Sequence, residues 1–371
     1  MTYISSSFII IFFYFIFLKF SKNLKIKFST FNIFFLIKVF FIVLFISLHE
    51  FELYGTDTLS HYHNFNNFNL KNQLMGDNLI LGMNYILVNF FYMNFLTINL
   101  LTIAPSMFGL MLLLSIIKDV KDYHCRLILY CLLFIPSFNF WTNGLNKDMF
   151  TFFGSSILFY GIYKKNLVVI FISILILFLI RPYIAFTLLL SSSLILVALS
   201  FANFRIRKLP IFILYVLGFY FVILFIEYIA ATLLGSFGIQ FLSGDFTSIV
   251  TNLQGHYSDT PLGIDSDTSY FSRFFSFLFF PLPFYTVGWN IYFLVMMLEN
   301  LFLLIALIFI LYKNNLFKGF NYYYLFGMFY LIIIFSMLAM VTSNHGIAFR
   351  QKWMIIPYVL ILLGSSFKKL K

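Results

Sequence analysis

Charge is scarce in this sequence. Asp, Glu, Lys and Arg make up only 10% of its 371 residues, and 62% of the residues are hydrophobic, whereas about 25% of the residues of a soluble domain are charged. Such a composition excludes an ordinary soluble domain, because too few polar side chains exist to cover a surface in water. In a bilayer, only helices or a closed barrel satisfy the backbone. The apolar runs are far longer than about ten residues and do not alternate, so they predict helices.

Cysteine is nearly absent as well. Cys125 and Cys131 are too few for a disulfide framework, and they show no metal-ligand spacing. The first residues, MTYISSSFIIIFFYFIF, contain no basic residue before the apolar stretch and no small-residue cleavage site. They predict a first membrane-spanning helix rather than a removable signal peptide.

Eleven apolar runs predict membrane-spanning helices. They lie near 4–20, 29–48, 94–117, 126–141, 149–163, 167–181, 184–202, 209–233, 290–312, 322–342 and 353–367. The sequence therefore predicts an all-α polytopic membrane protein with a single integral membrane domain, 1–371. A further run, 79–93, contains Asn and Gly and predicts an interfacial or re-entrant helix within a first external loop, 49–93.

The basic residues indicate which loops face the cytoplasm. Seventeen of the 24 Lys and Arg residues lie in alternate connections between the predicted spans, and the positive-inside rule assigns those connections to the cytoplasm. The N-terminus is then outside and the C-terminus cytoplasmic. The run 167–202 has basic residues at both ends, so it predicts a hairpin that turns outside at Arg181. The net charge of +11 thus marks topology, and no nucleic-acid-binding motif accompanies it.

The predicted outer loops collect most of the acidic residues and histidines. Nine of the 13 acids and five of the six His fall there. The largest outer loop, 234–289, has an Asp-rich middle and then an aromatic stretch that predicts a helix in the interface. A long external loop over a membrane site is typical of a lid or a substrate groove. An enzyme acting at the outer membrane face has a use for such side chains, whereas a channel or scaffold does not.

Several outer residues suit a transfer reaction. Asp57 follows the second span, where partial desolvation raises a carboxyl pKa toward that of a general base for a sugar hydroxyl; its alternative roles are a solvated loop residue or a helix N-cap. Arg181 and Arg350 suit phosphate oxygens, or else they snorkel to lipid headgroups. Lys147 and Asp148 belong to the site or form a local ion pair.

Other polar residues carry weaker signals. His61 is expected to hydrogen-bond substrate together with Tyr62. A metal held by His61 and His63 is a second alternative, which is disfavoured because residues i and i+2 do not share a helix face. Glu227 and Glu299 lie within predicted spans, where a charge is costly, so both are functional candidates.

The order of these features resembles bacterial polysaccharide polymerases, the Wzy-type O-antigen polymerases and the EpsG-like group, which are related to GT-C glycosyltransferases. The segments that carry the resemblance are GTDTLSHYHNF, GMNYILVNFFYMNF, PSFNFWTNGLNKDMF, LIRPYIAF and HGIAFRQKWMIIPYVLIL. Asp57 falls where the GT-C pattern has its outer-loop acid. Arg181 and Arg350 fall where outer-loop arginines hold a pyrophosphate.

The resemblance implies a multi-pass glycosyltransferase of the bacterial inner membrane. It would polymerise undecaprenyl-pyrophosphate-linked oligosaccharide repeat units of an O-antigen or capsule at the periplasmic face, without a cofactor or metal and with a separate chain-length regulator. The alternatives are a GT-C enzyme that adds one sugar from a polyprenyl phosphate and a lipid-linked oligosaccharide flippase. The candidate catalytic residues are Asp57 and Arg350. The candidate substrate-binding residues are Arg181, His61, Tyr62, Lys147, Asp148, Arg273 and His345.

Overall fold

The described part of the chain is built from helices. The computed structural model describes residues 2–50, 57–68, 76–191, 270–281, 291–313, 322–341, 345–353 and 355–364, and all regular structure within these ranges is helical. The all-α class is therefore confirmed for these residues. The predicted span 209–233 and most of the predicted loop 234–289 lie outside them. The chain forms two compact units, Met1–Ala185 with Trp353–Lys371, and Phe186–Lys352, and each is described by itself.

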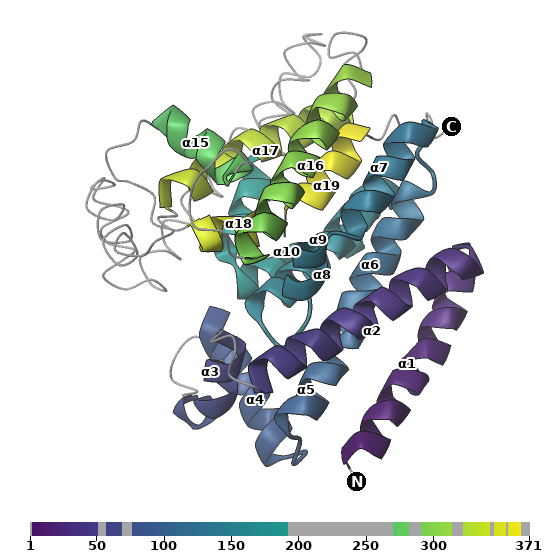
Figure 1. The fold of residues 1–371 in the computed structure, drawn as a ribbon, viewed down its shortest axis with the longest axis vertical. Helices are drawn as coiled ribbons and strands as arrows, with labels where there is room; N and C mark the ends of the chain where they lie inside the picture. The colour runs from purple at the N-terminus through teal and green to yellow at the C-terminus, as the bar shows by residue number, and fades with distance from the viewer. Residues whose placement is uncertain are drawn as a thin grey trace. The chain divides into compact units, whose positions relative to one another are not determined.

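The first unit contains most of the helices that Figure 1 labels. They are α1 (Thr2–Asn23), α2 (Phe28–Glu50), α3 (Asp57–His63), the 3₁₀ turn η1 (Phe65–Asn67), α4 (Gly76–Asn89), α5 (Phe95–Leu101), α6 (Ile103–Ile117), α7 (Tyr123–Leu133), α8 (Pro136–Trp141), α9 (Lys147–Lys164), α10 (Leu167–Ile180) and α19 (Ile356–Gly364). The interfacial or re-entrant helix predicted over 79–93 corresponds to α4.

Two predicted spans are each divided into two helices. The run 94–117 breaks at Thr102, whose hydroxyl donates to the carbonyl of Asn99 at 2.6 Å and so competes with the backbone hydrogen bonds of a continuous helix. The run 126–141 breaks before Pro136, which occupies the first position of α8. Proline fits that position but interrupts a preceding helix.

Helix α9 packs between α6 and α10. Small residues permit the close approach, because a side chain at Gly109 of α6 would press on Phe152 of α9, and one at Gly154 of α9 would press on Leu177 of α10. Close packing at small residues is typical of helices in membranes. Helix α19 joins this core through Tyr358, whose hydroxyl donates to the carbonyl of Phe152 at 2.6 Å.

Large apolar side chains remain exposed on the outside of the first unit. On α1 they include Phe8, Ile11, Phe12 and Phe15, and on α2 Ile33, Leu36 and Phe40. Three helical stretches of the described residues are long and apolar enough to cross a membrane, namely Phe28–His49, Phe95–Ile117 and Leu294–Tyr312. Contiguous exposed apolar surface of this kind fits contact with lipid rather than water. The membrane character predicted from composition is therefore supported.

The second unit contains α15 (Tyr270–Phe279), α16 (Ile291–Lys313), α17 (Tyr322–Val341) and most of α18 (His345–Trp353). The ring of Phe277 in α15 lies 5.6 Å from that of Phe335 in α17, centroid to centroid. Lys352 of α18 is buried. Its ammonium donates to the side-chain oxygen of Asn300 and to the carbonyl of Leu278, which ties α18 to α16 and α15.

Polar contacts of the first unit join helix ends in two separate groups. Lys118, after α6, donates to the carbonyl of Leu24 between α1 and α2. Tyr163, near the end of α9, donates to Asp119. Both contacts connect loops that the charge pattern predicts on the cytoplasmic side. The second group joins the end of α10, the beginning of α9 and the beginning of α4, all predicted on the outer side.

Candidate functional site

The turn before α9 is built from buried asparagines. Asn146 is the N-cap of α9, and its side-chain oxygen accepts from the backbone N–H of Met149 at 2.8 Å, as a helix N-cap does. The amide of Asn146 also donates to the carbonyl of Asn143 at 2.8 Å. Between them, Gly144 has a φ of +78°, a backbone conformation that glycine adopts without strain. These bonds fix the position at which α9 begins.

Residues at and just before the break between α5 and α6 also bond to this turn. The backbone N–H of Gly144 donates to the hydroxyl of Thr102 at 3.1 Å, and that of Leu145 donates to the side-chain oxygen of Asn99 at 3.0 Å. Asn99 and Thr102 are buried. Each thus satisfies a backbone group that has no water to bond. The TNGLN segment is therefore enclosed by α5 and α6.

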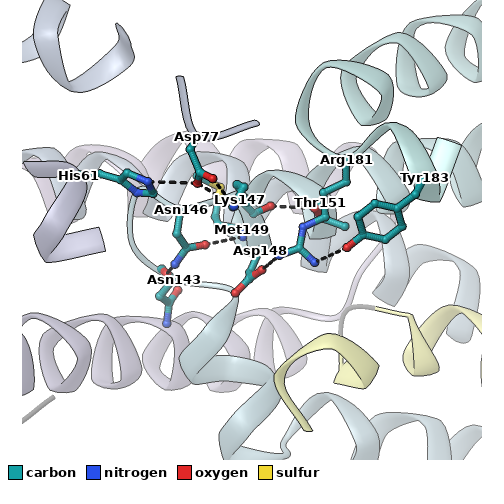
Figure 2. A network of polar contacts seen from close by, with 10 residues as sticks. All are labelled: His61, Asp77, Asn143, Asn146, Lys147, Asp148, Met149, Thr151, Arg181 and Tyr183. Atoms are coloured by element: carbon teal, nitrogen blue, oxygen red, sulfur yellow. Dashed lines mark hydrogen bonds and ion pairs between the residues drawn. The ribbon is translucent and has the colours of Figure 1, made fainter. Parts of the chain in front are cut away.

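Lys147, the first residue of α9, contacts both oxygens of Asp77. The distances from its ammonium are 2.7 Å to Oδ1 and 2.8 Å to Oδ2. His61 of α3 places Nε2 3.1 Å from the same Oδ1. Figure 2 shows the three side chains converging from α3, α4 and α9.

Asp148, the next residue along α9, pairs with Arg181 at the end of α10. Arg181 also donates to the hydroxyl of Tyr183 at 3.1 Å. The Asp148 side chain is fully buried and that of Arg181 is only 9% exposed. Lys147 and Asp148 therefore do not form the local pair offered as an alternative, because each is bonded to a partner distant in the sequence (Figure 2).

The charged and basic side chains around Asp77 differ in their exposure to solvent. The Asp77 side chain is 56% exposed, Lys147 is 23% exposed and His61 is 11% exposed. The hydrogen bond from His61, together with that from Lys147, holds the pKa of the Asp77 carboxyl well below its usual range, although partial burial acts in the opposite direction. The carboxylate thus stays ionised at neutral pH.

Only one of the two ring nitrogens of His61 contacts Asp77. Its Nδ1 is buried and has no hydrogen-bond partner among the described residues. A neutral imidazole that donates through Nε2 carries its lone pair on Nδ1, so the ring has the chemistry of a proton acceptor there. His63 is exposed while His61 is buried, so the two imidazoles do not converge on a metal. Within the described ranges, His, Cys, Asp and Glu form no group of three that would hold one.

The structure brings together four of the nine predicted site residues: His61, Lys147, Asp148 and Arg181. Tyr62 lies apart from their polar contacts and packs against an apolar cluster formed by Ile80, Ile98, Leu145 and Met149. Its ring also meets that of Phe95 edge-on, with centroids 5.2 Å apart.

The other four predicted residues are placed by their backbones. Asp57 begins α3, one turn before His61, and His345 begins α18. Arg273 lies in α15. The side chains of these three residues are outside what the structure describes. Arg350 lies in α18 and is half-buried.

Asp77 and the asparagine turn were not predicted as parts of a site. Asp77 was counted only among the outer acids, although its position at the start of a short amphipathic helix was a signal. Asn99 and Thr102 were visible as polar interruptions of an apolar run. Their partners lie more than 40 residues away in the sequence, and no local pattern indicates them.

Another buried basic side chain, Lys38, lies in α2. The ammonium of Lys38 donates to the hydroxyl of Thr142 at 2.5 Å and lies 5.3 Å from the ring centroids of both Phe138 and Phe152. Lys38 is near the middle of the candidate span Phe28–His49. It connects α2 to the turn that begins α9.

Comparison with known proteins gives no relative: no protein-family model, curated protein or solved structure matches the chain.

Proposed function

We propose that this chain is a glycosyltransferase of the bacterial inner membrane that polymerises undecaprenyl-pyrophosphate-linked oligosaccharide repeat units at the outer face. One observation carries the proposal: ionisable residues from three loops predicted outside, around His61 and Asp77, Lys147 and Asp148, and Arg181, form one site at the ends of apolar helices. Contacts between loops predicted inside form a separate group. This sorting supports a chemical site on one membrane face.

The composition of the site suits transfer from a lipid diphosphate. Such a donor already carries an activated leaving group, so the protein needs to hold its charge, orient the acceptor hydroxyl and take up a proton. Lys147 and His61 supply cationic or hydrogen-bonding groups beside the more exposed Asp77. Asp57, one helical turn before His61 in α3, is the proposed general base.

A lipid-linked oligosaccharide flippase is the second candidate, and Lys38 favours it. A transporter that carries charged headgroups needs cationic side chains within the membrane, and Lys38 lies near the middle of a candidate span. The surroundings of Lys38 argue against this transport role, because Thr142 and two aromatic rings enclose its ammonium.

Deletion of the gene, followed by a gel of surface polysaccharide, tests both functions. A polymerase deletion leaves lipid-linked single units at the outer face, and a flippase deletion accumulates them on the inner leaflet. Wild-type chain restores the ladder of long products, whereas Asp57→Asn is expected to insert normally and leave single units. A product with only one added sugar indicates a single-sugar transferase. An unchanged ladder after deletion would reject both proposals.

A further inference from the structure

Two basic side chains from different helices share one carboxylate oxygen. Oδ1 of Asp77 lies 2.7 Å from the ammonium of Lys147 and 3.1 Å from Nε2 of His61, and Oδ2 accepts a second contact from Lys147 at 2.8 Å. Asp77 thus occupies the place that two oxygens of a tetrahedral anion would take between these groups. Charge-assisted bonds of this type are among the stronger hydrogen bonds of proteins.

The carboxylate lies on the solvent side of the bases that it holds. Asp77 is more than half exposed, whereas Lys147 and His61 are largely covered. The neighbouring pair of Asp148 and Arg181 differs, because both partners are buried. An arriving anion therefore competes with Asp77 for Lys147 far more readily than with Asp148 for Arg181. Removing one partner of a buried pair leaves an uncompensated charge, whereas a pair near solvent is held only weakly.

His61 has one ring nitrogen that Asp77 does not contact. Its side chain is about nine-tenths buried, and Nδ1 has no hydrogen-bond partner among the described residues. Buried polar atoms in native proteins are usually satisfied. Asp77 therefore satisfies only one of the two ring nitrogens, and the polar surroundings of this histidine are incomplete.

We propose that Asp77 is a displaceable carboxylate, which holds Lys147 and His61 in the unloaded protein and gives them up to a phosphate-type anion. The inference deepens the proposed function and rests on it only for the source of the anion, the diphosphate of the lipid-linked donor. It assigns anion recognition to Lys147 and His61 in place of Arg181, which braces α9 against the end of α10 through Asp148.

Binding of inorganic pyrophosphate to the full chain in lipid nanodiscs tests the site by calorimetry. Asp77→Asn removes the competing charge and is expected to tighten pyrophosphate binding about tenfold, whereas Lys147→Ala is expected to weaken it about tenfold. The matched control is Asp119→Asn. Asp119 is also an exposed carboxylate, and it accepts a hydrogen bond from Tyr163 at the other group of helix ends, so its replacement is expected to leave binding unchanged.

Two results would overturn the inference. One is an Asp77→Asn protein that elutes and melts as a folded protein and yet binds pyrophosphate no more tightly than wild type. The other is wild-type affinity in Lys147→Ala, which decides the matter even where Asp77→Asn fails to fold.

Undecaprenyl pyrophosphate in the same nanodiscs distinguishes the source of the anion. Tighter binding of the lipid than of inorganic pyrophosphate, with the same variant effects, supports the lipid-linked donor. Equal binding overturns that assignment and supports the anion site alone. Polymer synthesis is measured separately. If the wild-type chain makes no polymer but Asp77→Asn still tightens pyrophosphate binding, the polymerase proposal is rejected and the anion site is retained.

Discussion

At the scale of single residues, the two ion pairs of the site differ in what they contribute. Asp148 and Arg181 are both buried, so removing either partner leaves an uncompensated charge. We expect Asp148→Asn and Arg181→Gln each to destabilise the protein by about 3–5 kcal/mol. The double variant is expected to lose less than the sum of the two single losses, because the partners interact directly.

Melting of the purified chain in detergent measures this double-mutant cycle. Asp77→Asn is the control, because its partners are nearer to solvent and an exposed pair contributes only about 0–1 kcal/mol. Additive losses in the double variant would contradict the direct pairing of Asp148 with Arg181.

The Asp77 carboxyl also gives a pH dependence of known sign. Its pKa is held below the usual value of about 4, by His61 first and then by Lys147. Its contribution to stability is therefore fully present above about pH 4 and is lost as the pH falls through the lowered folded-state pKa. The difference in melting temperature between wild type and Asp77→Asn should be largest near neutral pH and shrink in acid. A difference that grows on acidification would contradict this account.

At the scale of secondary structure, the start of α9 positions two charged residues of the site. Asn146→Ala removes the cap bond to Met149, which is expected to cost about 1 kcal/mol and to displace Lys147 and Asp148. Asn166→Ala is the matched control, because Asn166 caps α10 in the same way and is exposed far from the site.

Polymer yield in complemented cells separates the two N-cap variants. Both variants are expected to lose stability, Asn146→Ala the more, because Asn146 is buried and also donates to the carbonyl of Asn143. Polysaccharide is expected to fall only in Asn146→Ala, and an equal fall in Asn166→Ala would show that cap loss acts through stability alone.

The sequence predicted the described helices better than it predicted their interruptions. Long apolar runs indicate helices directly, because the bilayer leaves the backbone no other partners. The break at Thr102 depends instead on the N–H of Gly144, 42 residues away. Likewise, the sequence offered Asp148 as the ion-pair partner of Lys147, but the structure pairs Lys147 with Asp77, 70 residues away. Charge alternation indicates which loops share a membrane face, but it does not indicate which side chains meet there.

At the scale of the whole molecule, the predicted sidedness has a direct test. Asn66 in η1 and Lys165 after α9 are both exposed, and the charge pattern places them on opposite faces. With Cys125 and Cys131 replaced by Ala, a membrane-impermeant maleimide should label Asn66→Cys in intact spheroplasts. Lys165→Cys should react only after permeabilisation. The reverse labelling pattern would place the candidate site on the cytoplasmic face and would reject the proposed function.

The enclosed turn at Gly144 and Leu145 has a consequence for biosynthesis. Asn99 and Thr102 leave the ribosome more than 40 residues before the backbone N–H groups that they accept from. Until those groups arrive, the nascent α5–α6 segment exposes polar side chains to lipid or to the translocon. We therefore expect the segment to settle at its final depth only after the beginning of α9 has been synthesised, and we expect a chain truncated near residue 141 to be degraded faster by membrane proteases than the full chain.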